Sequence, residues 1–126
     1  MTAPIRRPPR GSSIDWLSAR PQPYEVLGFC DLRDGRPWLA VSEMNQALRL
    51  DPGSWEPNYA LAIAQAAAGT DPRSNAARAL RMNPKEPLTR QAAKALIGSS
   101  PSEWPRRARV LNAAALASVD LSIVPP

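Results

Sequence analysis

Fifteen prolines divide this chain of 126 residues into short segments. Proline lacks a backbone N–H and clashes inside helices and central strands, which excludes a long sheet or a long coiled coil. Proline is tolerated in the first turn of a helix, and several prolines here stand at the start of a stretch with helical apolar periodicity. Their positions predict six helices, over residues 22–33, 37–50, 55–68, 72–82, 87–97 and 103–118.

A short internal repeat supports the same division. Residues 47–52, Ala-Leu-Arg-Leu-Asp-Pro, recur as residues 79–84, Ala-Leu-Arg-Met-Asn-Pro, at a displacement of 32 residues. Each copy closes a predicted helix with a proline, and this displacement is typical of helix–turn–helix repeats. The helix at 55–68 is apolar on nearly every side and is therefore predicted to be the central one. The expected fold class is all-α.

Composition disfavours most catalytic chemistry. Histidine is absent and Cys30 is the single cysteine, so the commonest general base, the commonest metal ligand and an internal disulfide are all missing. Two glutamates, Glu25 and Glu56, could act as an acid–base pair, but we interpret them as solvated helix residues. The chain is therefore expected not to be an enzyme, with no catalytic residue, no metal site and no cofactor.

The net charge of +5 comes mainly from the two ends of the chain. Residues 1–20 are predicted to form a basic, Pro/Arg-rich leader that is mostly disordered, with a juxtamembrane segment as the alternative. Residues 21–118 are predicted to be the helical domain, and residues 119–126 an apolar tail. Three arginines of the last helix are interpreted as a solvated face, with nucleic-acid or anionic-lipid binding as the alternative: Arg106, Arg107 and Arg109.

The first helix pair resembles the tetratricopeptide repeat family, whose pattern combines aromatic, large apolar and small residues at fixed positions and closes with a proline. Residues 21–54 match it with Tyr24, Leu27, Gly28, Ala40, Met44, Ala47 and Pro52. The following unit matches it with Leu61, Ala62, Ala79 and Pro84. The resemblance covers about residues 20–118, and it implies antiparallel helix pairs stacked as a short right-handed solenoid, with these eleven residues packing the repeats.

A narrower resemblance concerns residues 23–33, 51–56 and 68–73. They are similar to the soluble repeat tails of bacterial O-antigen ligase or polymerase-type membrane proteins. This would make the chain an accessory domain of a larger protein, although none of that family's glycan-transfer chemistry lies in these residues. No apolar run approaches the ~18 residues that cross a bilayer. The expected location is cytoplasmic, with membrane association only through such a parent protein.

The tetratricopeptide resemblance also implies a concave groove lined by the first helix of each pair. The corresponding residues are Gln22, Glu25, Phe29, Arg33, Glu56, Tyr59 and Ile63. Such an apolar groove with acidic flanks would suit a protein or peptide partner, above all an amphipathic or basic helix. A stripe of Phe29, Tyr59 and Ile63 would need a cover, and the chain's own residues 119–124 are the alternative occupant. Nucleic acid is not an expected partner on this interpretation.

Overall fold

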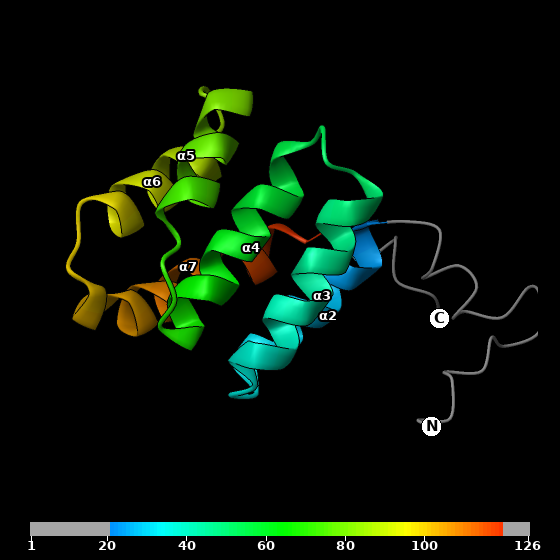
Figure 1. Cartoon of the computed structure of the whole chain (residues 1–126), viewed down its shortest axis with the longest axis horizontal. Helices are drawn as coiled ribbons and strands as arrows, with labels where there is room; N and C mark the ends of the chain where they lie inside the picture. The colour runs from blue at the N-terminus through cyan, green and yellow to red at the C-terminus, as the bar shows by residue number, and fades with distance from the viewer. Residues whose placement is uncertain (1–20, 120–126) are drawn as a thin grey trace, which may run out of the picture.

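The computed structural model describes residues 21–119, with side chains from Pro23 onward. Every regular element in this part of the chain is helical, and the fold is therefore all-α, as predicted (Figure 1). The elements are α2 (Pro21–Arg33), α3 (Pro37–Leu50), α4 (Trp55–Ala68), α5 (Arg73–Met82), α6 (Pro87–Ile97), the 3₁₀ turn η1 (Pro101–Glu103) and α7 (Trp104–Ser118). The predicted leader, and the tail from residue 120, lie outside the described residues.

Proline and glycine set several of the helix boundaries. Pro37 and Pro87 are the first residues of α3 and α6, where a missing N–H costs no helical hydrogen bond. Helix α4 ends at Ala68 and is capped by Gly69, whose φ of 80° is left-handed. The next N–H, from Thr70, donates to the Gln65 carbonyl at 2.9 Å. This pattern satisfies the last carbonyls of α4 and needs a residue without a Cβ.

The internal repeat builds two equivalent helix ends. Asp51 closes α3 with φ −146° and ψ 74°, and Asn83 closes α5 with φ −145° and ψ 77°. Their N–H groups donate to the carbonyls of Ala47 and Ala79, which are themselves 32 residues apart. A proline follows in each copy, so neither helix continues. The same six-residue pattern therefore encodes the same local structure twice.

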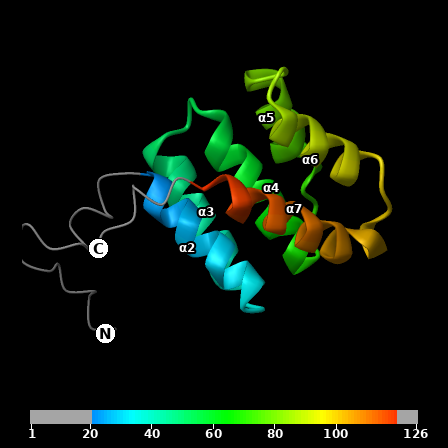
Figure 2. The same cartoon turned by 180° about the vertical axis from the view of Figure 1, so that it is seen from behind.

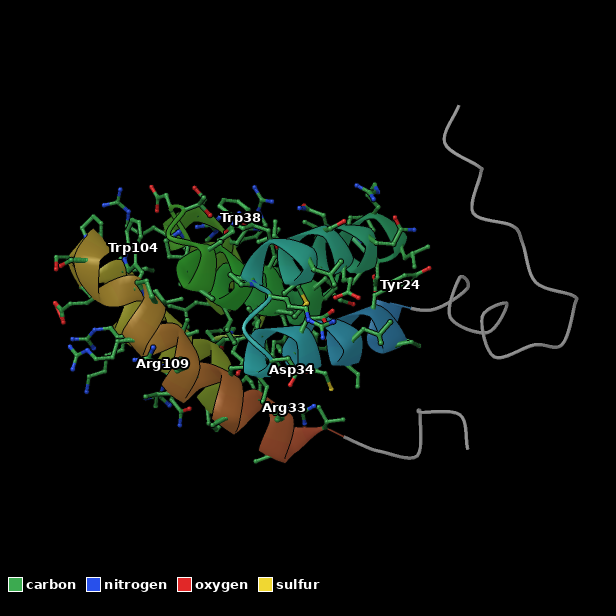
Figure 3. All side chains as sticks on the ribbon, turned by 90° about the horizontal axis from the view of Figure 1, so that it is seen from below. Tyr24, Arg33, Asp34, Trp38, Trp104 and Arg109 are labelled. Atoms are coloured by element: carbon green, nitrogen blue, oxygen red, sulfur yellow. The ribbon has the colours of Figure 1, made fainter. Side chains whose placement is uncertain are left out.

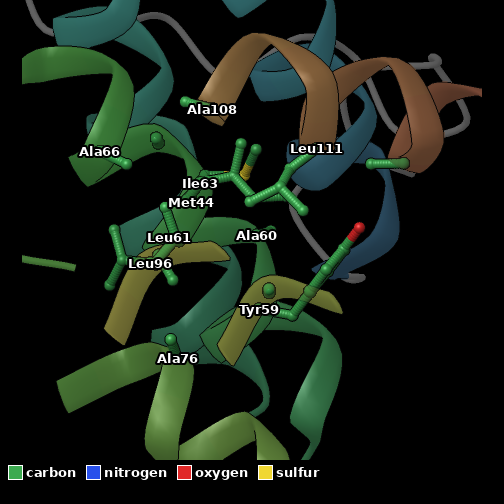
Figure 4. Close-up of a cluster of buried hydrophobic side chains, with 14 of the residues drawn as sticks. Met44, Tyr59, Ala60, Leu61, Ile63, Ala66, Ala76, Leu96, Ala108 and Leu111 are labelled. Carbon is green, nitrogen blue, oxygen red and sulfur yellow. The ribbon is translucent and has the colours of Figure 1, made fainter. Parts of the chain in front are cut away.

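Helix α4 lies at the centre, as predicted, and packs against α2, α3, α5, α6 and α7. The core around it is made of small and medium side chains, with Met44, Ile63 and Leu96 completely buried (Figure 4). Most of the residues predicted to pack the repeats are buried: Gly28, Ala40, Met44, Ala47, Leu61, Ala62 and Ala79. Alanine at so many of these positions allows the helix axes to approach closely.

The other four residues predicted to pack the repeats are not buried. Leu27 is 40% exposed, because Glu25 and Phe29 are turned towards the neighbouring helices and position 27 is on the opposite side of α2. Tyr24 is only half-buried. Pro52 and Pro84 are exposed, and they act by ending helices rather than by packing.

The last helix departs from the arrangement that the resemblance implied. In a stack of pairs each pair contacts only its neighbours, which would keep α7 away from α2. Helix α7 instead packs against α4 and α2 as well as α6, and Figure 2 shows it crossing α4 towards the start of α2. The N-terminal half of α7 lies beside the C-terminal end of α2, and the last turns of α7 lie beside the first turns of α2. The two helices are therefore antiparallel. The described helices therefore form a closed bundle instead of an open row.

Candidate functional site

Helix α7 covers the face of α2 and α4 where an open groove was expected. Phe29, Tyr59 and Ile63 are 6%, 3% and 0% exposed, in one cluster with α7 residues such as Leu111 (Figure 4). The Asn112 side-chain amide donates to the Phe29 carbonyl at 3.1 Å and ties the two helices together. The stripe therefore has a cover, as expected, but among the described residues this cover is the chain's own helix α7, with Val119 beside it. Residues 120–124 of the predicted tail lie outside the described residues.

One part of the expected groove remains open, beside the last turns of α7. We call it the acidic cavity, and its volume is about 120 Å³, enough for the end of one side chain. It is lined by Glu25, Val26, Phe29, Trp55, Glu56, Tyr59, Leu88, Ala115, Ser118 and Val119. The structure thus brings together four of the seven predicted groove residues: Glu25, Phe29, Glu56 and Tyr59.

The other three predicted groove residues do not join this cavity. The Gln22 side chain lies outside the described residues. Ile63 is completely buried under α7, and Arg33 lies at the far end of α2, beside a different cavity. These positions share a helix face with the others, but α7 lies across that face and divides it.

Glu25 is the least expected feature of the acidic cavity. It was interpreted as a solvated residue, yet it is only 7% exposed. Burial, followed by the nearby charges of Glu56 and Asp51, raises the pKa of its carboxyl from 4.5 to about 7. The Glu25 carboxyl therefore titrates in the neutral pH range, whereas Glu56 at the rim of the cavity is exposed.

Tyr59 supplies a second polar atom in an apolar wall. Its hydroxyl is buried, and it has no hydrogen-bond partner among the described residues. Burial and the charge of Glu86 raise the pKa of this hydroxyl above its usual range, so it stays a neutral donor. Its ring packs edge-on against Trp55, with 5.7 Å between the ring centres. The cavity therefore combines aromatic surface with two carboxyl groups.

Sequence reasoning missed the part of the site that α7 contributes. Ala115 and Ser118 line the cavity, and Val119, predicted as the start of an apolar tail, lines it too. A signal was present, because residues 108, 111, 112 and 115 follow helical spacing and all are buried. That spacing indicates an inner face on α7, although it does not indicate which helices the face meets.

The three arginines of α7 differ in their pairing. Arg106 and Arg107 each bond to the Glu103 carboxylate, at 3.2 and 2.9 Å, in the turn before them. Arg109 is exposed and has no ion pair among the described residues. The terminal arginines therefore do not present one uniform basic surface.

No protein-family model, no curated protein and no solved structure matches this chain. Among the described helices, none combines the length and the apolar character that crossing a membrane requires. Within the same residues, no three Cys, Asp or Glu side chains gather closely enough to hold a metal ion. The geometry of the cavities is therefore the basis for assigning a function.

Proposed function

We propose that this chain is a protein-interaction module rather than an enzyme, and that the acidic cavity binds a basic, partly apolar peptide segment. The observation that carries the proposal is an aromatic, apolar wall with two glutamates, Glu25 and Glu56, beside it. Lysine and arginine combine an apolar stem with a cationic head. A peptide that presents such a side chain matches both the wall and the carboxyl groups.

The buried carboxyl explains why a cation is favoured over a neutral group. An ionised Glu25 in this wall has lost most of its water, and a guanidinium or ammonium group would compensate for that loss. The rings of Trp55 and Tyr59 add a favourable surface for the same cation. Binding would lower the pKa of Glu25 from about 7 and release its proton, so affinity should rise as the pH rises through 7.

The helical-repeat interpretation forms part of this proposal. The first pair, α2 and α3, carries the tetratricopeptide-like pattern, and its small positions Gly28, Ala40 and Ala47 are buried. Within that interpretation α7 lies along α2 and α4 where a bound helix would lie. The module would therefore be a variant of the repeat in which the chain's own helix α7 occupies the groove. Only the acidic cavity would then be left for a partner.

The test uses two matched peptides with the full chain. A short helical peptide that repeats Leu and Arg carries a fluorescent label, and a peptide that repeats Leu and Glu serves as its charge-reversed partner. We expect fluorescence anisotropy to show that Glu56→Gln weakens binding of the Leu/Arg peptide about tenfold, the size of one charged hydrogen bond. Asp34→Asn removes the same charge from an exposed residue at the far end of α2 and should leave binding unchanged.

Two results would count against the proposal. One is a Leu/Arg peptide that binds the Glu56→Gln variant as tightly as the original chain. The other is an affinity that stays constant while the pH rises through 7, because the proposed contact involves the titrating carboxyl of Glu25.

A further inference from the structure

A second cavity lies on the opposite edge of α7, where that helix meets the ends of α2 and α4. We call it the arginine cavity, and its volume is about 420 Å³, within the range of ligand pockets. It is lined by Leu32, Arg33, Ala67, Ala108, Arg109, Asn112, Ala113 and Leu116. It shares no lining residue with the acidic cavity, so each of the two cavities can be occupied without the other.

The two arginines stand on the two helices that border the arginine cavity. Arg33 ends α2 and Arg109 belongs to α7, as the view from below in Figure 3 shows. The Arg33 side chain is 61% exposed and contacts Asp34 at 3.3 Å, a weak surface pair. No acidic residue of the described chain lines the cavity itself. An anionic partner would therefore meet two exposed guanidinium groups above an apolar floor.

Asn112 forms part of the wall of the arginine cavity. The residue is 6% exposed, and its amide nitrogen donates to the Phe29 carbonyl, which fixes the orientation of the side chain. The other amide atom, Oδ1, is buried without a partner among the described residues. The Asn112 side chain therefore belongs to the packed wall of the cavity, and the two arginines are its accessible polar groups.

We propose that the arginine cavity binds an acidic, amphipathic peptide segment of a partner protein. An apolar side chain of the segment fills the space between Leu32 and Leu116, and its carboxylates meet Arg33 and Arg109. A fatty acid would fill the apolar floor but would bring a single carboxylate for two arginines, whereas a peptide segment can present two. The chain's own residues 120–126 carry one acidic side chain for two arginines, which favours an external segment.

The experiment uses the full chain with the labelled Leu/Glu helical peptide, and anisotropy reports its binding. Arg109→Gln should weaken the Leu/Glu peptide about tenfold and leave the Leu/Arg peptide unchanged. Arg78→Gln, which removes an exposed arginine of α5, is the matched control and should have no effect. Ala113→Glu places a repelling charge at an exposed position of the cavity wall without disturbing the core, and it should also weaken the Leu/Glu peptide.

Three outcomes would overturn the proposal. The first is equal affinity of the Leu/Glu peptide for the original chain and for Arg109→Gln. The second is binding of that peptide only after Leu121→Ser and Ile123→Ser are introduced, which would make the chain's own tail the occupant. The third is Arg109-dependent binding to phosphatidylglycerol vesicles by a chain that does not bind the peptide. If the Leu/Arg peptide does not bind, that result would contradict the proposed function of the acidic cavity, but it would not affect the proposal for the arginine cavity.

Discussion

Gly28 shows how closely the first two helices approach. A Cβ added at this position would lie 2.5 Å from Cε and 2.7 Å from Sδ of Met44, a side chain with no exposed surface. Gly28→Ala should gain up to about 1 kcal/mol of helix propensity but lose about 1–3 kcal/mol through overpacking, so we expect net destabilisation. Urea unfolding measures this change.

The matched control is Gly53→Ala, where an added Cβ meets open space. It should change the free energy of unfolding by less than about 0.5 kcal/mol. Equal effects of the two substitutions would show that the contact between Gly28 and Met44 does not limit the approach of α2 to α3.

Glu25 should make stability depend on pH. Its pKa is about 7 in the folded chain against an ordinary value of 4.5, so between these values the folded state holds a proton that the unfolded state has released. Raising the pH through this window therefore destabilises the fold, by at most about 3 kcal/mol. Glu25→Gln removes this loss, and its stability advantage should grow between about pH 4.5 and pH 7 and then level off.

Chemical denaturation at a series of pH values provides the measurement. The pKa of Glu43 is also raised, to about 8, by burial and by Asp31, but Glu43 is present in both chains and its contribution cancels in the difference. Asp34→Asn, which removes one carboxylate from an exposed residue at the far end of α2, is the control for the loss of a negative charge. If the difference in free energy of unfolding between Glu25→Gln and the original chain does not change with pH, the Glu25 carboxyl is solvated and not buried.

At the scale of the element, a hydrogen bond within an apolar face ties α7 to α2, and another, from Trp104 Nε1 to the Leu96 carbonyl, ties it to α6. The Asn112 amide donates to the Phe29 carbonyl, and Leu111 and Ala115 are buried beside it. Asn112→Asp keeps the shape of the side chain but replaces the donor by a second acceptor. We expect a loss of about 1–3 kcal/mol and faster hydrogen exchange in α7 than in α5.

Ala113→Asp adds the same charge one residue away, at an exposed position of the same helix. It should cost less than about 0.5 kcal/mol, because its carboxylate stays in water. If Asn112→Asp and Ala113→Asp increase the rate of hydrogen exchange in α7 to the same extent, the hydrogen bond from Asn112 to Phe29 does not anchor the helix.

At the scale of the whole molecule, the chain covers its own apolar face with α7. Deleting residues 120–126 should leave the binding of an apolar-surface dye unchanged, because α7 already shields Phe29, Tyr59 and Ile63. Deleting residues 104–126 should raise dye binding strongly, with circular dichroism to follow the helices that remain. Equal dye binding by the two shortened chains would contradict α7 as the cover.

The sequence by itself determined the helices. Prolines at the start of α3 and α6, Gly69 after α4 and the Asp-Pro and Asn-Pro ends of α3 and α5 act through backbone geometry within a few residues. Local signals of this kind are visible without any tertiary contact. The all-α class, the central position of α4 and the buried small residues were predictable for the same reason.

Only the tertiary structure decided where α7 packs, and with it the shape of the site. The buried positions 108, 111, 112 and 115 indicate an inner face but do not specify whether it meets α6 alone or also α4 and α2. Packing depends on the shapes of surfaces that are far apart in the sequence, and the bond between Asn112 and Phe29 spans 83 residues. The burial of Glu25, the covering of Ile63 and the division of the groove into two cavities follow from that long-range contact, which no local pattern encodes.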